Sequence, residues 1–231
     1  MIRPAARRGI SHLLIAFVGV AVLAAACDFH YRAAADPVLD EVVIQTIPNA
    51  GSGFNHPAPR LSAQELTSIL QDVRVEFKSH WLQRFVTGKL EPVPLFDEAT
   101  LARVVPPLVE ALVQAGTQDR IVFYVAQRRA SDRRDVTSGT LFVQGRGLTI
   151  ALANHQNRVD VVPGLAAYDR QNPEVAVAPQ QFLLAFGRTE FVIDRGDDAI
   201  DKAPETELPA VTVDYARYLA YKSRTATGNG S

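Results

Sequence analysis

The segment Ile121-Val-Phe-Tyr-Val-Ala-Gln127 predicts a β-strand, because Ile121, Phe123 and Val125 alternate with their neighbours as the side chains of a strand do. Two more strand-like segments follow, Thr140-Leu-Phe-Val-Gln144 and Leu148-Thr-Ile-Ala-Leu-Ala153. The segment between them, Gly145-Arg-Gly147, is typical of a tight turn. The centre of the chain therefore predicts antiparallel strands joined by a hairpin.

A second hairpin is predicted further along the chain. The segments 181–186 and 189–193 are both strand-like and flank Gly187-Arg188, which suits a type II′ turn. The intervening segment, 154–180, reads as a loop with at most one short strand. Residues 211–222 fit either a helix or an edge strand. Together these segments give about five antiparallel strands.

Helices are predicted before the strands. Ser62 and Glu65 form a capping box, and the apolar stripe that follows Leu66 extends as far as Gly88. Asp97 is a candidate N-cap for a second helical region, which Pro106-Pro107 is expected to break in two. The resulting prediction is an α+β fold, with N-terminal helices packed on a five-stranded antiparallel sheet within a single domain, residues 61–224.

The N-terminus has the parts of an export signal. Arg3, Arg7 and Arg8 precede an apolar run of residues 13–26. As a helix this run would be about 21 Å long, too short for a hydrocarbon core of about 30 Å. It ends in Leu23-Ala-Ala-Ala-Cys27. A cleaved signal is therefore favoured over a transmembrane helix.

This ending resembles the lipobox of bacterial lipoproteins, although Ala24 stands where that family prefers leucine. The resemblance covers residues 1–28 only. It implies that peptide 1–26 is removed and that Cys27 receives a diacylglycerol and further acyl chains such as palmitate. The protein would then be held at a membrane of the cell envelope, facing the periplasm. Asp28 favours the inner membrane over the outer one.

The residues after the signal divide into an anchored tether, the domain and a tail. Residues 27–60 are rich in proline, glycine and alanine and predict a tether, with one short strand at residues 42–44. Residues 225–231 predict a disordered tail. Cys27 is the only cysteine, so no disulfide is expected.

Composition and motifs exclude several functions. The formal charge is −1, and removing the three arginines of the signal makes it −4, so nucleic acid is not an expected partner. No P-loop, G-x-G-x-x-G, G-x-S-x-G or H-E-x-x-H pattern occurs, and no cofactor, metal or catalytic residue is assigned. The histidines after the signal (His30, His56, His80 and His155) have no metal-site spacing. The acidic run Asp194–Asp201 is read as a solvated loop, with calcium binding as the alternative.

One arginine cluster is a candidate contact surface. Arg128, Arg129, Arg133 and Arg134 lie on the connection between the first two strands, where they could contact an acidic partner or lipid headgroups. Two aspartates on the same loop reduce its positive charge, and a solvated hairpin tip is the default interpretation. The aromatic and basic run from Tyr215 to Lys222 is read as the last packed element of the domain.

These observations favour a non-enzymatic lipoprotein that binds another envelope protein as an accessory subunit. One alternative is an envelope hydrolase that uses paired carboxylates drawn from Asp160, Asp169 and Asp194. Another is a small-ligand carrier with an apolar cavity between sheet and helices. The mature domain resembles no family.

Overall fold

A computed structural model describes residues 40–48, 60–77, 91–130, 132–161, 168–193 and 208–228. The predicted signal peptide, Cys27, Asp28, His30, His56, His80 and the run Asp194–Asp201 lie outside these ranges. Within them, no helix is long and apolar enough to cross a membrane.

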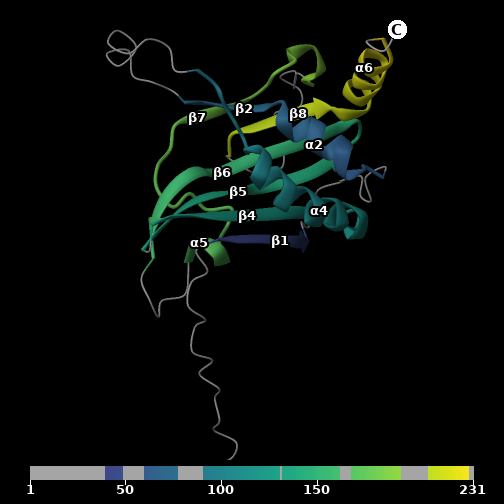
Figure 1. Ribbon diagram of the computed structural model, residues 1–231. Coiled ribbons are helices and arrows are strands. Elements are labelled where there is room, and N and C mark those ends of the chain that lie inside the picture. Colours follow the sequence, from purple (N-terminus) through teal and green to yellow (C-terminus); the bar gives the residue numbers. More distant parts are fainter. Residues whose placement is uncertain are drawn as a thin grey trace, which may run out of the picture.

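The main sheet has five antiparallel strands (Figure 1). Its order is β1-β4-β5-β6-β8, with the bounds β1 Glu41–Pro48, β4 Asp119–Ala130, β5 Arg133–Gln144, β6 Gly147–Asp160 and β8 Ala210–Asp214. The predicted hairpin at Gly145 is present as the β5–β6 connection, and Gly145 has a φ of 58°, which favours glycine. A five-stranded antiparallel sheet is present, as predicted, but only three of its strands, β4, β5 and β6, are among the five that the sequence predicted, and these three are longer than expected.

Strand β1 lies in the segment that we expected to be a tether. All eight of its residues pair with β4, from Glu41 opposite Ala126 to Pro48 opposite Asp119. Val42 and Ile44 pack against the main core. Residues 41–48 are therefore part of the fold, and only residues 28–39 separate Cys27 from the first described residue, Asp40.

A second sheet of three strands was not predicted. Its order is β3-β2-β7, formed by β3 Val93–Pro94, β2 Val73–Phe77 and β7 Phe182–Phe186. The predicted helix from Ser62 ends at Gln71, and the next residues alternate between buried and partly exposed as strand β2. The predicted second hairpin is wrong: β7 pairs with β2, and the residues after it form the short 3₁₀ helix η1 Thr189–Phe191.

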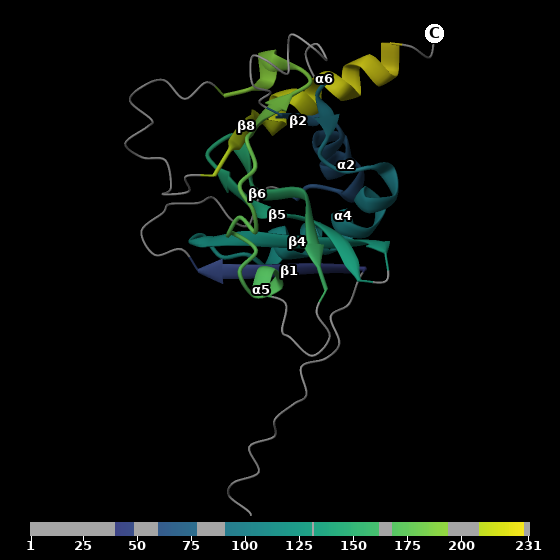
Figure 2. The ribbon, with the colours of Figure 1, turned by 90° about the vertical axis from the view of Figure 1, so that its left-hand side faces the viewer.

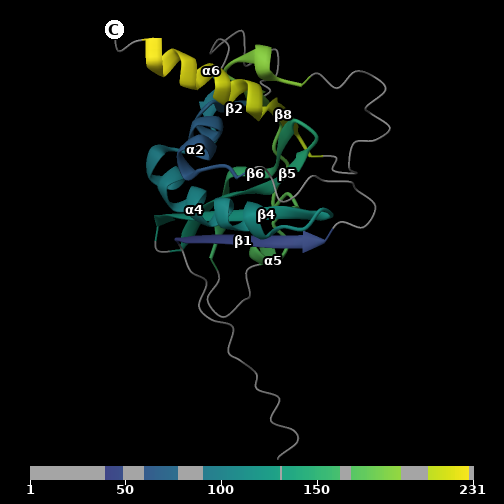
Figure 3. The ribbon, with the colours of Figure 1, turned by 90° about the vertical axis from the view of Figure 1, so that its right-hand side faces the viewer.

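Helices α2 Ala63–Gln71 and α4 Glu98–Gln114 lie on the same side of the main sheet (Figures 1 and 3). The capping box of Ser62 and Glu65 is present, and Asp97 caps α4. The break predicted at Pro106-Pro107 is wrong, because α4 continues through both prolines. Its Val104, Val105 and Leu108 are buried, and this packing offsets the lost backbone hydrogen bonds.

The chain ends in a helix, so the helices are not chiefly N-terminal as predicted. Strand β8 runs directly into α6 Tyr215–Gly228, and both readings of residues 211–222 are thus partly right. Helix α6 includes residues 225–228, which we expected in the tail. Tyr218 lies wholly inside the core and donates a hydrogen bond to Asp72 at 2.7 Å. That contact ties the last helix to the end of α2.

Candidate functional site

The main sheet becomes polar at one end of its helix-covered face. Two register shifts interrupt the β5–β6 pairing, one between Val136 and Ser138 and one between Ser138 and Gly139. Beyond them Gln156 has a φ of 47°, in the left-handed region that non-glycine residues seldom adopt. Bulges and strained residues of this kind gather at functional sites, so this end of the sheet is the first candidate.

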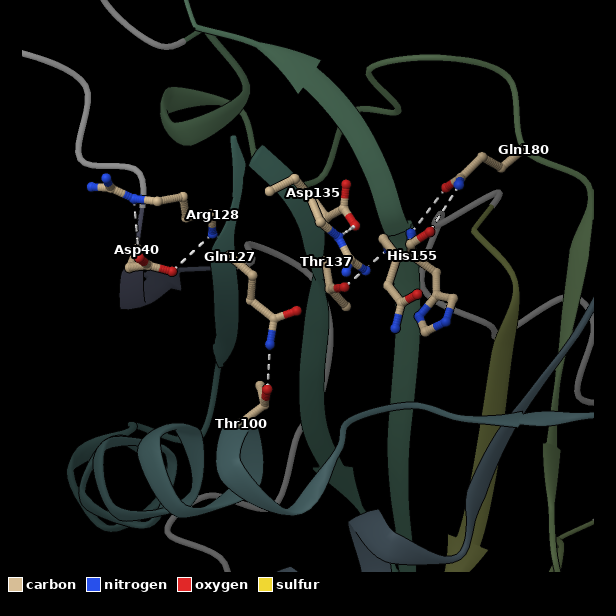
Figure 4. Close-up of polar contacts among 10 residues, drawn as sticks. Asp40, Thr100, Gln127, Arg128, Asp135, Thr137, His155 and Gln180 are labelled. Carbon is tan, nitrogen blue, oxygen red and sulfur yellow. Dashed lines mark hydrogen bonds and ion pairs between the residues drawn. The ribbon is translucent and has the colours of Figure 1, made fainter. Parts of the chain in front are cut away.

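Side chains from three strands and one helix meet there (Figure 4). The Gln127 amide donates a hydrogen bond to the hydroxyl of Thr100 in the first turn of α4. The Thr137 hydroxyl accepts a hydrogen bond of 3.0 Å from the backbone N–H of Gln156. Hydrogen bonds from Thr100 also lower the pKa of the capping Asp97. Each of these polar groups therefore has a hydrogen-bond partner within the cluster.

The space between them is small. Leu95, Phe96, Val125 and the polar groups just described line a partly open cavity of about 10 Å³. That volume holds about one water molecule. The cavity is also mainly polar, whereas a carrier of small apolar ligands needs a large apolar one.

His155 lies close to this cluster but is isolated from it chemically. Its side chain is 1% exposed, neither ring nitrogen has a hydrogen-bond partner, and its ring lies 5.9 Å from that of Phe77. Burial lowers the pKa of His155 to about 4. The imidazole is therefore neutral and weakly basic at pH 7, which makes it a poor general base.

The opposite face of the sheet carries a buried ionic cluster. Arg134 is 2% exposed and bonds to both carboxylate oxygens of Asp169 at 2.9 and 3.1 Å. Tyr124 donates a hydrogen bond of 2.7 Å to the same carboxylate. Burial and this carboxylate raise the pKa of Tyr124. Asp169 belongs to α5 Tyr168–Gln171, so the cluster fixes α5 on the sheet.

The chain from α5 to β7, residues 168–181, is named the strap here (Figure 2). Three buried polar side chains of β5 and β6 hold its backbone. Ser138 donates to the carbonyl of Pro173 at 2.6 Å. The Asn154 amide donates to the carbonyl of Val175 and accepts from the N–H of Val177, at 2.9 and 2.8 Å. Asn157 donates to the carbonyl of Ala178 at 3.3 Å.

The outer side of the strap is apolar. Five consecutive residues, Val175-Ala-Val-Ala-Pro179, are all exposed. The exposed fractions of Val175 and Val177 are 46% and 41%. Tyr168, at the start of the strap, is 66% exposed. A run of exposed apolar residues is unfavourable in water, and where it occurs it marks a functional surface.

The four candidate arginines are each matched to an acidic side chain. Arg128 pairs with Asp40 at 3.6 Å, Arg133 pairs with Asp160 at 3.2 Å, and Arg129 pairs with Asp135. Arg134, which we expected at the surface, is buried inside the protein and pairs with Asp169. The structure brings these residues to one end of the sheet, but with an equal number of acids, and this weakens the case for a basic contact patch.

Two of the three carboxylates of the alternative hydrolase, Asp160 and Asp169, are described, and they have different partners; Asp194 lies outside the described residues. Asp169 is buried against Arg134 and Tyr124, whereas Asp160 is exposed and pairs with Arg133. Among the described residues, no three His, Cys, Asp or Glu side chains gather as metal ligands would. The geometry of the described ranges therefore favours neither the hydrolase nor the carrier.

Comparisons with known proteins found no counterpart: no protein-family model, no curated protein and no solved structure matches this chain. Sequence reasoning had treated residues 175–179 as an ordinary loop. The signal was present in the run Val-Ala-Val-Ala-Pro, which lacks the polar residues of a solvated loop.

Proposed function

We propose that this protein is a lipid-anchored, non-enzymatic binding subunit of the cell envelope, and that the strap contacts a partner protein. The observation that carries the proposal is the exposed run Val175–Pro179, held in place by Ser138, Asn154 and Asn157. The domain uses buried side chains to display apolar residues to solvent. Exposed apolar residues that are held rigidly in this way are typical of a binding surface.

The fastening of the strap makes it suitable for binding. A partner that covers Val175 and Val177 gains their burial, about 25 cal/mol for each Å² of apolar surface. It does so without ordering a loop, which would cost about 0.5–1.5 kcal/mol for each side chain immobilised. Five small residues form only part of an interface, and the exposed Tyr168 at the other end of the strap is proposed as a further contact with the partner.

The anchor raises the concentration of this surface near a membrane. The twelve residues 28–39 separate acylated Cys27 from Asp40. A flexible chain of that length has a root-mean-square span of about 20 Å and a limit of about 40 Å. Tethering at that distance increases the effective concentration for a membrane-associated partner and raises its apparent affinity without any new contact.

Co-purification of the full-length lipoprotein in mild detergent, after gentle crosslinking, tests the proposal. The Val177→Asp variant places a charge on the strap, and Val113→Asp is the matched control, because Val113 is 53% exposed on α4. We expect envelope proteins that are recovered with the unchanged protein and with Val113→Asp, but are lost with Val177→Asp. In Cys27→Ala they should be reduced. Equal recovery from both aspartate variants would overturn the proposal.

A further inference from the structure

The two edges of the main sheet differ in how they are closed. Edge strand β8 is covered by the chain after η1, where the N–H of Ile193 donates to the carbonyl of Thr212 at 2.9 Å and Val192 forms a bridge with Val213. Edge strand β1 pairs only with β4 among the described strands. It forms the lower margin of the sheet in Figures 1 and 3. Among the described residues, the β8 edge is therefore closed and the β1 edge is open.

Strand β1 also lacks the features that keep edge strands apart. Its sequence, Glu41-Val-Val-Ile-Gln-Thr-Ile-Pro48, contains no lysine, and its proline is the last residue. Its pairing with β4 has no register shift, so the strand has no bulge. Natural proteins blunt exposed edges with lysines, prolines and bulges, because an unpaired row of backbone groups recruits another strand. Five of its eight residues are β-branched, which favours pairing further.

Among the described residues, β1 forms one ion pair, and this ion pair lies at its first residue. Arg170 of α5 pairs with Glu41 at 2.7 Å. The middle of the strand, Gln45 and Thr46, is exposed. Residues 42–48 span about 20 Å at 3.4 Å per residue. None of them is fully buried, and Gln45, Thr46 and Pro48 are exposed.

We propose that β1 pairs with β1 of a second copy of this chain, antiparallel and about a two-fold axis at Gln45. In this register Val43 lies opposite Ile47 of the second copy, and Ile44 opposite its Thr46. No charged residue stands opposite another within residues 42–48. The two sheets join into one sheet of ten strands, and the helix-covered faces stay on the same side.

The chemistry of the edge favours a second copy over an unrelated strand. A two-fold interface needs a self-complementary surface. This register provides one, because β-branched residues face each other on both sides of a central Gln45–Gln45 pair. The two Asp40 residues would lie about 34 Å apart at 3.4 Å per residue. Two tethers of up to about 40 Å each can reach one membrane from those positions.

The pairing places Gln45 of one copy beside Gln45 of the other, so a cysteine there reports it directly. In an antiparallel ladder the two Cα atoms would be about 4.5–5.5 Å apart, within the range of a disulfide. The full-length protein carrying Gln45→Cys is oxidised in mild detergent and run on a non-reducing gel. Leu183→Cys, 49% exposed on β7, is the control, and the unchanged protein identifies any product of Cys27.

We expect a crosslinked dimer from Gln45→Cys and not from Leu183→Cys. In sedimentation, the unchanged protein and the control Thr189→Lys should have the mass of two chains, and Thr46→Lys the mass of one. Circular dichroism confirms that Thr46→Lys is folded. A monomeric unchanged protein, equal crosslinking from both cysteines, or a foreign chain crosslinked at residue 45 would overturn the proposal.

Discussion

Replacing His155 with leucine should remove a large part of the protein's sensitivity to mild acid. The pKa of His155 is about 6.5 in an unfolded chain and about 4 in the folded protein, because burial disfavours the charged imidazole. Protons thus bind the unfolded chain more readily. The contribution of His155 to stability is complete above pH 6.5 and is lost as the pH falls towards 4. One unit of pKa corresponds to about 1.4 kcal/mol, so His155 should account for about 2 kcal/mol between pH 7 and pH 5.

Urea denaturation of the full-length protein in detergent, at pH 7 and at pH 5, measures this effect. The unchanged protein should lose about 2 kcal/mol more unfolding free energy between the two pH values than His155→Leu does. The Asp97 carboxyl titrates below this window, since its pKa is lowered by Thr100, and contributes little to the difference. If the two proteins lose the same free energy, the buried neutral imidazole is refuted.

Three further substitutions test the interior. Arg134→Met leaves the charge of Asp169 buried without its partner and should lower the unfolding free energy by about 3–5 kcal/mol. The double variant with Asp169→Leu should recover most of this loss. An unfolding free energy in urea that Arg134→Met does not lower would contradict the buried ion pair. Asn154→Ala removes two of the hydrogen bonds that hold the strap and should speed hydrogen exchange of the backbone amides at residues 175–178 by about tenfold or more. Unchanged exchange rates would show that these hydrogen bonds do not hold the strap. Gly139→Ala should lower the unfolding free energy by about 3 kcal/mol or more, because its Cβ atom would overlap the carbonyl oxygen of Ala151. A thermal midpoint equal to that of the unchanged protein would contradict this close approach of the two strands.

Much of the fold could be predicted because the capping residues and the apolar periodicity of several elements lie within the elements themselves. The capping box at Ser62 and the N-cap Asp97 fixed two helix starts, and the alternation after Ile121 identified β4. The apolar stripe after Leu66 was misleading, since Val73-Arg-Val-Glu-Phe77 satisfies a helical spacing and also alternates as a strand. In the structure this segment is a strand that pairs with β7, and Val73 and Val75 are buried in the main core.

Non-local contacts account for two further errors. The Gly187-Arg188 pair suited a hairpin, but the N–H of Gly187 donates to the carbonyl of Asp72, 115 positions earlier, at 2.7 Å. No local pattern contains that partner. The strap is similar, because the groups that hold it are ordinary polar residues of β5 and β6 whose role depends on residues 173–178 crossing the sheet. Sequence reasoning could have noticed the apolar run, but not what fastens it.

Photocrosslinking in cells shows whether the strap contacts a partner protein. A photoreactive residue replaces Ala176, in the exposed run of the strap, or Val113 on α4 as the control. The proposed function predicts that residue 176 crosslinks to a specific envelope protein and that residue 113 does not. Adducts that are absent from residue 176, consist only of lipid, or are the same from both positions would contradict it.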